Sequence, residues 1–152
     1  MEFVERIKAK AAQDIKTIVL PEAAEERNIK AANQILKEGF AKLVLIGDPD
    51  KIHHLASEYY LDQIDKAVIV DPLNNPKKEE YVELMLKLRA SKGLTREQAE
   101  KLIVDPLYLG ALMVKNGDVD GEVAGANNAT GDVLRPAFQY VKTMPGISVV
   151  SG

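Results

Sequence analysis

Short apolar runs alternate along this chain with longer segments in which apolar residues recur every three or four positions. Runs of the first kind predict buried strands, and spacing of the second kind predicts amphipathic helices. The expected strands are residues 17–20, 42–46, 67–70, 122–124 and 147–150. The main expected helices are residues 23–38, 50–59, 77–91 and 133–142. Apolar strands separated by helices predict an α/β fold with three layers, αβα, and a mostly parallel sheet, in a single domain of residues 1–152.

Residues that start and stop helices support this order of elements. Gly39 is placed to end the first long helix, because glycine readily takes the left-handed conformation that follows a last turn. Thr95 and Gln98 have the spacing of a capping box, which predicts that a further helix opens at Thr95. Pro106 suits the first turn of the next helix, where the missing N–H costs nothing.

Composition and charge exclude several classes of function. The net charge is -3 and no sustained basic run occurs, which argues against nucleic acid as a partner. The chain has no cysteine, so a disulfide framework, a cysteine-ligated zinc site and a thiol nucleophile are excluded. The N-terminus is too charged for a signal peptide and no apolar run reaches membrane-spanning length. We therefore expect a soluble, cytoplasmic protein with no membrane partner.

The segment of residues 125–132 combines glycines with neutral hydrogen-bond donors directly after a predicted strand. Its glycines are Gly125 and Gly131, and its donors are Asn127, Asn128 and Thr130. In open parallel sheets, ligands bind beyond the carboxyl ends of the strands, and the start of the next helix adds unpaired N–H groups. The segment therefore fits a phosphate or a developing oxyanion. It fits equally an ordinary turn in which Thr130 or Asp132 caps the helix, because it lacks the glycine spacing of known nucleotide-binding loops.

Two arginines are candidate ligand contacts. Arg135 lies opposite the apolar side of the predicted helix of residues 133–142, so it is free to face either a cleft or water. Arg89 points along a largely apolar face of its helix. A buried guanidinium needs a carboxylate, a cluster of carbonyl oxygens or a ligand, although its long stem can also extend to the edge of the core. Surface solvation is the alternative for Arg135, and extension of the stem to the edge of the core is the alternative for Arg89.

Other polar residues give less support for a reaction centre. His53 and His54 are adjacent, and adjacent residues of a helix do not face the same point, so no metal site is expected there. Asp118 and Asp120 can be read as acid–base groups on one face of a strand, but positions that flank a turn explain them better. The serines near the end of the chain have no histidine base nearby in sequence, so no catalytic triad is expected.

The chain resembles the phosphate acetyl/butyryl transferase family. The resemblance is strongest in MVKNGDVDGEVAGA at residues 113–126, in ATGDVLRPA at residues 129–137 and in residues 143–152. Earlier marks are IVLPE at residues 18–22 with Arg27, LIG at residues 45–47, and Arg89 before KGLT at residues 92–95. The resemblance covers the whole chain, is weakest from residue 53 to residue 74, and is closer to the acetyl than to the butyryl enzymes.

The resemblance implies reversible transfer of an acetyl group between phosphate and coenzyme A. It implies a fold like that of the isocitrate and isopropylmalate dehydrogenases, with two α/β domains around a cleft, a homodimer, and no bound cofactor or metal. Coenzyme A and acetyl phosphate would be substrates. By this resemblance Arg89 and Arg135 would line the substrate cleft. Thr130 would lie beside them with its loop, which contains Asn127, Asn128 and Gly131.

Members of this family continue well past the position of Gly152. The resemblance places their general base and further serine and arginine contacts in that later part. We therefore expect this chain to be the N-terminal portion of a longer two-domain enzyme, incomplete in its fold and inactive or nearly inactive by itself. Butyryl transfer, and a non-catalytic binding or oligomerisation module, are the alternatives. A nicotinamide-dependent dehydrogenase of the related fold would need a nucleotide fingerprint and metal-binding aspartates, and neither pattern occurs.

Overall fold

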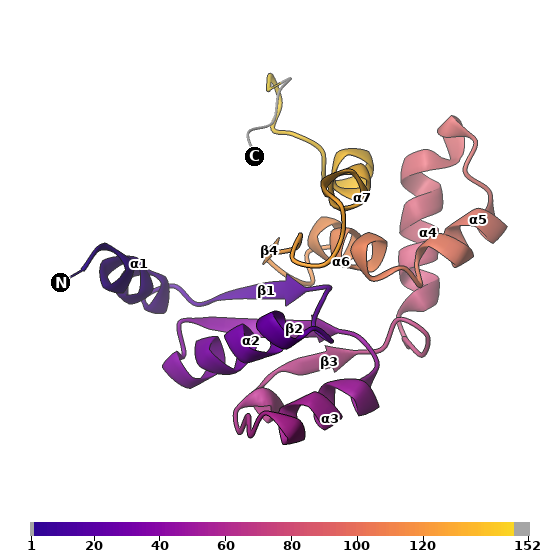
Figure 1. The fold of residues 1–152 in the computed structure, drawn as a ribbon. Helices are drawn as coiled ribbons and strands as arrows, with labels where there is room; N and C mark the ends of the chain where they lie inside the picture. Colours follow the sequence, from indigo (N-terminus) through magenta and orange to yellow (C-terminus); the bar gives the residue numbers. More distant parts are fainter. Residues whose placement is uncertain (1, 148–152) are drawn as a thin grey trace.

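Four short parallel strands form one sheet in the order β3-β2-β1-β4, with helices on both faces (Figure 1). The structure is a computed structural model that describes residues 2–147. The strands are β1 (Lys16–Leu20), β2 (Ala41–Ile46), β3 (Val68–Val70) and β4 (Gly121–Glu122). β1 pairs in parallel with β2 along its whole length, and with β4 only at Ile18 and Val19. The predicted α/β fold with a parallel sheet is confirmed.

Helices connect the strands and extend beyond them. The α-helices are α1 (Phe3–Ala12), α2 (Glu26–Glu38), α3 (Pro49–Glu58), α4 (Lys78–Arg89), α5 (Arg96–Leu102), α6 (Pro106–Lys115) and α7 (Thr130–Pro136). Two short 3₁₀ turns, η1 (Ile64–Lys66) and η2 (Ala90–Lys92), follow α3 and α4. A π-helical turn, η3 (Ala137–Val141), continues α7 directly.

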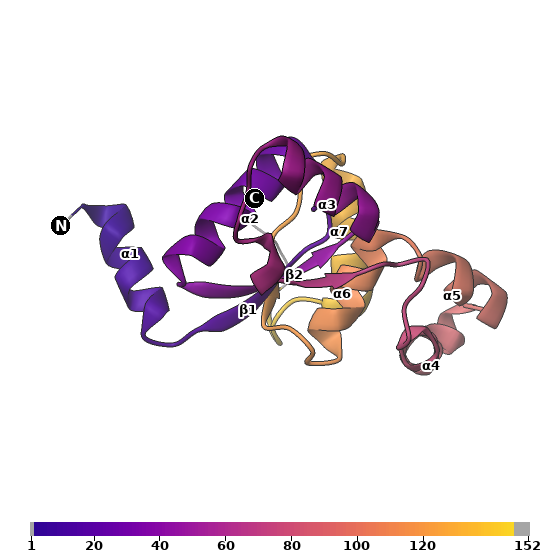
Figure 2. The ribbon, with the colours of Figure 1, turned by 90° about the horizontal axis from the view of Figure 1, so that it is seen from below.

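Alternate residues of β2 serve two separate hydrophobic clusters. Leu43 and Leu45 pack with residues of α2 and α3, whereas Val44 and Ile46 pack with residues of α4 and α6. Successive side chains of a strand point to opposite faces, so one buried strand contributes to both clusters. Figure 2 shows α2 and α3 on one side of the strands and α6 on the other. The sheet is therefore the middle of the three layers that the sequence predicts.

The helix signals in the sequence act as predicted at three places. Gly39 ends α2 in the left-handed conformation, with φ of 74°. The capping box at Thr95 is complete, because its side chain accepts the N–H of Gln98 while the Gln98 side chain accepts the N–H of Thr95. Pro106 opens α6 in the first turn.

Several predicted boundaries differ from the structure. α2 begins at Glu26 and not at residue 23, because the Glu25 carboxylate accepts the N–H of Asn28 and so caps the helix there. β4 ends at Glu122 and not at residue 124, since the N–H of Val123 makes the last backbone bond to β1. α7 begins at Thr130, three residues before the predicted start.

Two further elements lie outside these comparisons. The strand predicted at residues 147–150 falls, apart from Ile147, outside the residues that the structure describes. α1 was not predicted; it has no buried residue, and Lys8 Nζ joins it to Glu38 at 3.0 Å (Figure 1). Within residues 2–147, no helix combines the length and the hydropathy needed to cross a bilayer.

Candidate functional site

A cavity of about 270 Å³ with a mixed polar and apolar lining lies where the carboxyl ends of β1 and β2 meet the loop after β4. Its lining includes Glu22, Lys51, Asp105, Asn127 and Asn128. Sequence analysis placed a ligand crevice at this edge of the sheet, because loops that leave parallel strands in the same direction gather there. The structure therefore brings two of the predicted residues, Asn127 and Asn128, to the predicted edge.

The loop of residues 125–128 is built around the carboxylate of Glu22. Oε1 of Glu22 accepts the backbone N–H of Gly125 at 2.6 Å and of Ala126 at 3.1 Å. Oε2 accepts the backbone N–H of Asn127 at 2.7 Å and the side-chain amide of Asn128 at 2.8 Å. Both oxygens are thus fully engaged. Of the side-chain donors that sequence analysis offered to a phosphate, Asn128 binds an internal anion here, together with three backbone N–H groups of the same loop.

The pKa of the Glu22 carboxyl agrees with this arrangement of donors. Burial alone would raise the pKa of Glu22, whose exposed fraction is 7%. The hydrogen bonds from Asn128 and from the three backbone N–H groups outweigh burial and hold the pKa below its ordinary value. Glu22 is therefore ionised at neutral pH. No sequence reasoning singled it out, although an acidic residue directly after a strand, at the edge that holds a glycine- and asparagine-rich loop, is a usable signal.

Arg27 forms a second attachment for the same loop. Its Nη2 donates to the carbonyl oxygen of Ala126 at 2.7 Å, and its Nε donates to the carboxylate of Glu25 at 3.1 Å. Because Glu25 caps α2, this chain of contacts joins the loop to the start of that helix. The loop is therefore fixed from both β1 and α2.

Thr130 and Gly131 begin α7, directly after the loop. The N-cap is Ala129, which makes no side-chain hydrogen bond, so the alternative of a turn capped by Thr130 or Asp132 is wrong. Arg135 is exposed, and its Nη1 lies 3.4 Å from Asp132 Oδ1. The prediction that Arg135 faces away from the apolar side agrees with this exposure. An exposed pair of this kind holds a side chain loosely.

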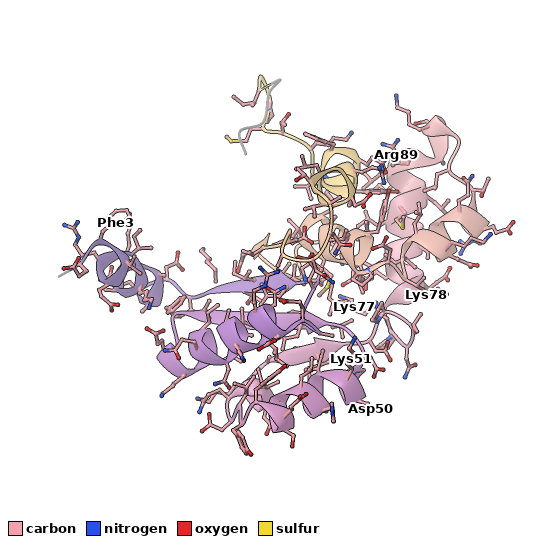
Figure 3. The ribbon with its side chains drawn as sticks, in the orientation of Figure 1. Phe3, Asp50, Lys51, Lys77, Lys78 and Arg89 are labelled. Carbon is pink, nitrogen blue, oxygen red and sulfur yellow. The ribbon has the colours of Figure 1, made fainter. Side chains whose placement is uncertain are left out.

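Arg89 lines a different cavity, of about 470 Å³. The walls come from α4, η2, α5, α6 and η3, and they include Lys92, Gln98, Tyr108 and Tyr140. The Arg89 guanidinium carbon lies 5.9 Å from the ring centroid of Tyr140, a cation–π distance. Figure 3 shows Arg89 at the end of α4, on the side that faces α7. Sequence analysis expected Arg89 to lie along an apolar face of its helix. In the structure its guanidinium lies between an aromatic ring and the open cavity.

The guanidinium of Arg89 makes no ion pair among the described residues, a property that it shares only with Arg6, an exposed residue of α1. Within the part of the chain that the structure describes, the arginine ion pairs are those of Arg27, Arg96 and Arg135. The carboxylate that a half-buried Arg89 could have used is thus absent among residues 2–147. Its charge faces the cavity beside Lys92, which adds a second cation to the same wall.

Tyr140 closes the inner side of this cavity. Its ring meets that of Tyr108 edge to face, with 6.2 Å between centroids. Its hydroxyl is buried and has no hydrogen-bond partner among the described residues. Burial raises the pKa of the Tyr140 hydroxyl, and the charge of Arg89 opposes that rise. Tyr140 therefore keeps a neutral, buried hydroxyl on the ring that borders the Arg89 cation.

The predicted site residues thus fall into separate groups. Asn127 and Asn128 line the cavity at the strand ends, and Arg89 lines the other cavity. Thr130, Gly131 and Arg135 line neither of these two cavities and lie exposed on α7 between the loop and η3. Gln139, which follows Arg135 by about one helical turn, does line the cavity of Arg89. The described chain therefore brings these groups to neighbouring elements but not into one enclosed pocket.

The remaining candidates have structural roles. Asp118 accepts hydrogen bonds from Lys77, Tyr81 and Asn116, as expected of a residue that fixes a turn. Asp120 accepts the backbone N–H of Thr17 at 2.8 Å. Both histidines are exposed, and residues 2–147 contain no group of three side chains suited to a metal ion.

Glu122 is a second acidic residue that sequence reasoning missed. Burial, with a smaller contribution from the charge of Glu22, raises the pKa of Glu122 to about 7. Its Oε1 is buried without a partner among the described residues, and a Cβ added to Gly110 would clash with that oxygen. Glu122 faces α6 and is absent from the linings of both cavities, so we do not assign it to the candidate site.

Comparison with known proteins identifies the family to which this sequence is similar. The family model for phosphate acetyl/butaryl transferase matches residues 2–152. A phosphate acetyltransferase of Clostridium acetobutylicum is 49% identical over 152 residues, which are 100% of this chain and 45% of that protein. One from Acetivibrio thermocellus is 50% identical over 99% of this chain and 45% of its own length. The chain thus spans less than half the length of these curated relatives.

Solved structures give the same result. A phosphotransacetylase from Streptococcus pyogenes matches with a TM-score of 0.91 and 31% identity, over 98% of this chain and 46% of that one. A phosphotransacetylase from Staphylococcus aureus matches with a TM-score of 0.87 and 36% identity, over 96% of this chain and 44% of its own. The arrangement of strands and helices described above is therefore shared with proteins about twice as long.

Proposed function

Since this chain belongs to the phosphate acetyl/butyryl transferase family, we propose that it forms part of an enzyme that transfers an acetyl group reversibly between phosphate and coenzyme A. Two relatives that are 49% and 50% identical are phosphate acetyltransferases, which favours acetyl over butyryl as the transferred group. The relatives are more than twice as long, so the proposal concerns a site to which residues 1–152 contribute one part.

The placement of Arg89 carries the proposal. Its guanidinium borders a cavity of about 470 Å³ together with Lys92, and it has no carboxylate partner among the described residues. A guanidinium binds two phosphate oxygens at once through parallel N–H groups. Coenzyme A and acetyl phosphate both carry phosphate groups, so either would supply the anion that Arg89 lacks.

Helix α7 would contribute the second part of the site. Arg135 is exposed and held only by a 3.4 Å contact with Asp132, so a phosphate oxygen can replace that carboxylate without a large cost. Thr130 and Gly131 offer a hydroxyl and a backbone approach in the preceding turn, next to Asn127 and Asn128. We propose that these residues contact substrate once the rest of the cleft is present.

The chemistry requires three things of such a site. The thiol of coenzyme A attacks the carbonyl carbon of acetyl phosphate, and the bond from that carbon to the phosphate oxygen breaks. The thiol proton passes to a base, and phosphate leaves with the electron pair. Arginines would stabilise the charge on the departing phosphate. We assign no base within this chain and place it in the part of the enzyme that these residues do not span.

Three further statements belong to the same proposal. Coenzyme A acts as a substrate, and no resident cofactor or metal takes part. The enzyme works in the cytoplasm. It is a homodimer, which is supported by the exposed apolar side chains of α1, namely Phe3, Val4 and Ile7.

The first test is coenzyme A binding to the 152-residue chain by isothermal titration calorimetry. Arg89→Ala removes the proposed phosphate contact and is expected to weaken binding about tenfold or more. Arg6→Ala is the matched control, because Arg6 is exposed on α1, away from both cavities. Equal affinity of the two variants would remove Arg89 from the site.

The second test measures catalysis. A chimera joins residues 1–152 to the remaining C-terminal part of the Clostridium acetobutylicum relative, and acetyl-CoA formation from acetyl phosphate is followed. The chimera should be active, the 152-residue chain should show little or no turnover, and Arg89→Ala or Arg135→Ala should reduce kcat/KM of the chimera. A folded chimera that consumes no acetyl phosphate would contradict the proposal.

A further inference from the structure

The loop between β4 and α7 has few attachments to the rest of the molecule. Backbone pairing with β1 ends at the N–H of Val123, and the first helical bonds of α7 start from Ala129. Within the described residues, the hydrogen bonds that tie residues 124–128 to other elements are the four to Glu22 and the one from Arg27. Glu22 therefore supplies most of the fixed contacts of this loop.

A carboxylate is chemically required at the centre of this arrangement. Four donors converge on two oxygens, and the contacts with Gly125 and Asn127 are short, at 2.6 and 2.7 Å, as expected for charge-assisted bonds. A glutamine side chain has one acceptor oxygen, so its NH₂ group would face N–H donors at the other position. Glu22→Gln thus removes the charge and sets donors against a donor, with almost no change in size.

We infer that Glu22 is a positioning residue, which holds residues 125–128 so that α7 presents Thr130, at its start, and Arg135, near its end, toward the substrate. The inference rests on the proposed function, because it assigns α7 to the substrate site. Glu22 borders the cavity at the strand ends, but it is buried and each of its oxygens accepts two hydrogen bonds from the protein, so we assign it no direct contact with substrate. It acts through the loop, in the way that a buried carboxylate fixes the direction of a neighbouring side chain.

Two features of the loop support this assignment. Gly125 has φ of 115°, a backbone conformation that favours glycine, and it is the first of three successive residues whose N–H groups converge on Glu22. The short distance in sequence from Asn128 to Thr130 means that a displacement of the loop passes directly to the first turn of α7. Arg135 follows in the same helix, at its other end.

The test compares wild type, Glu22→Gln and Glu26→Gln in the 152-residue chain. Glu26→Gln makes the same change of charge at the start of α2, where Glu26 contacts Lys30 and not the loop. Amide hydrogen exchange is measured by NMR for residues 125–127 and for β1 and β2. Coenzyme A affinity is measured by calorimetry at a temperature at which all three proteins are folded.

We expect Glu22→Gln to reduce protection of the amides of residues 125–127 by tenfold or more, to leave β1 and β2 protected, and to weaken coenzyme A binding about tenfold. Glu26→Gln should match wild type in both measurements. Unchanged protection in Glu22→Gln, or a loosened loop with unchanged affinity, would overturn the inference.

A wild-type measurement covers the case in which Glu22→Gln does not fold. As the pH falls through the pKa of Glu22, the amide signals of residues 125–127 should shift together and lose protection before those of β2 do. Signals that do not titrate would overturn the inference. If wild type binds no coenzyme A, the proposed function fails for this chain, and the amide measurements still decide whether Glu22 holds the loop.

Discussion

The hydroxyl of Tyr81 donates a hydrogen bond to the carboxylate of Asp118, with 2.5 Å between the two oxygens. Lys77 and Asn116 donate to the same carboxylate at 2.7 and 2.9 Å. Burial, and then the charge of Asp118, raise the pKa of the Tyr81 hydroxyl above its ordinary range. This contact joins α4, which carries Arg89, to the turn between α6 and β4. Lys77 and Tyr81 thus both tie the first turn of α4 to the turn that precedes β4.

Removing that hydroxyl should destabilise the protein moderately. Tyr81→Phe is expected to lower the free energy of unfolding by about 1 to 2 kcal/mol, because a hydrogen bond to a charged group is lost while Asp118 keeps its other donors. Urea unfolding followed by circular dichroism measures the change. Tyr60→Phe, at a residue that is 93% exposed, is the control and should leave stability unchanged.

Glu122 should give the protein a specific dependence of stability on pH. Its pKa is raised from 4.5 to about 7 in the folded state, so folding favours the protonated carboxyl. The resulting stabilisation is present in full below about pH 4.5 and is lost as the pH rises through 7.

Glu122→Gln cannot ionise, so the variant and the wild type should have similar stability at pH 4. At pH 8 the variant should be more stable, by on the order of 3 kcal/mol. Thermal unfolding across this pH range gives the comparison. A difference between the two proteins that does not change with pH would show that Glu122 is ionised equally in the folded and unfolded states.

Alanine substitutions of two helical glycines, Gly110 and Gly131, should have different effects on the stability of the protein. A Cβ on Gly110 would collide with Glu122 Oε1, so Gly110→Ala forces the buried carboxyl to move. We expect a net loss of about 1 kcal/mol or more, although alanine favours helix by about that amount. Gly131 has nothing within 4 Å of the same added atom, so Gly131→Ala should be neutral or slightly stabilising. Chemical unfolding of both variants decides between them.

Arg135 should matter little for folding. Its contact with Asp132 is long, at 3.4 Å, and both side chains are more than half exposed. Arg135→Ala is therefore expected to change the free energy of unfolding by ~0.5 kcal/mol or less. A large loss of stability would indicate an anchoring role in the fold and would weaken its assignment to the substrate. Thermal unfolding at low and high salt distinguishes these outcomes, since salt screens an exposed pair.

The order of strands and helices was predictable because local rules and burial agree. The runs that became β1, β2 and β3 are apolar on both sides, and Gly39, Thr95 and Pro106 set helix ends through their own backbone chemistry. The ends of β4 and α7 were predicted less well. These ends depend on where the backbone pairing of β4 with β1 stops and on the conformation of Gly125. No short window of sequence specifies either feature.

The candidate site was predictable in part for the same reason. Glycine and asparagine after a strand indicated a loop that organises N–H groups, and the structure contains such a loop. Its occupant was not predicted, because Glu22 is separated from Gly125 by 103 positions in the sequence. The ligand roles of Arg89, Arg135, Thr130, Gly131, Asn127 and Asn128 stay predictions.

The sequence by itself determined the parallel α/β fold, most helix ends and the family, since each depends on local pattern or on runs of residue identities. Only the tertiary structure decided which anion the loop of residues 125–128 binds, and that Arg89 and Asn128 line separate cavities. Those outcomes depend on the packing of distant segments around one sheet, which sets the distances between charges. Glu22 occupies the loop because β1 ends beside it, and that proximity exists only in the folded chain.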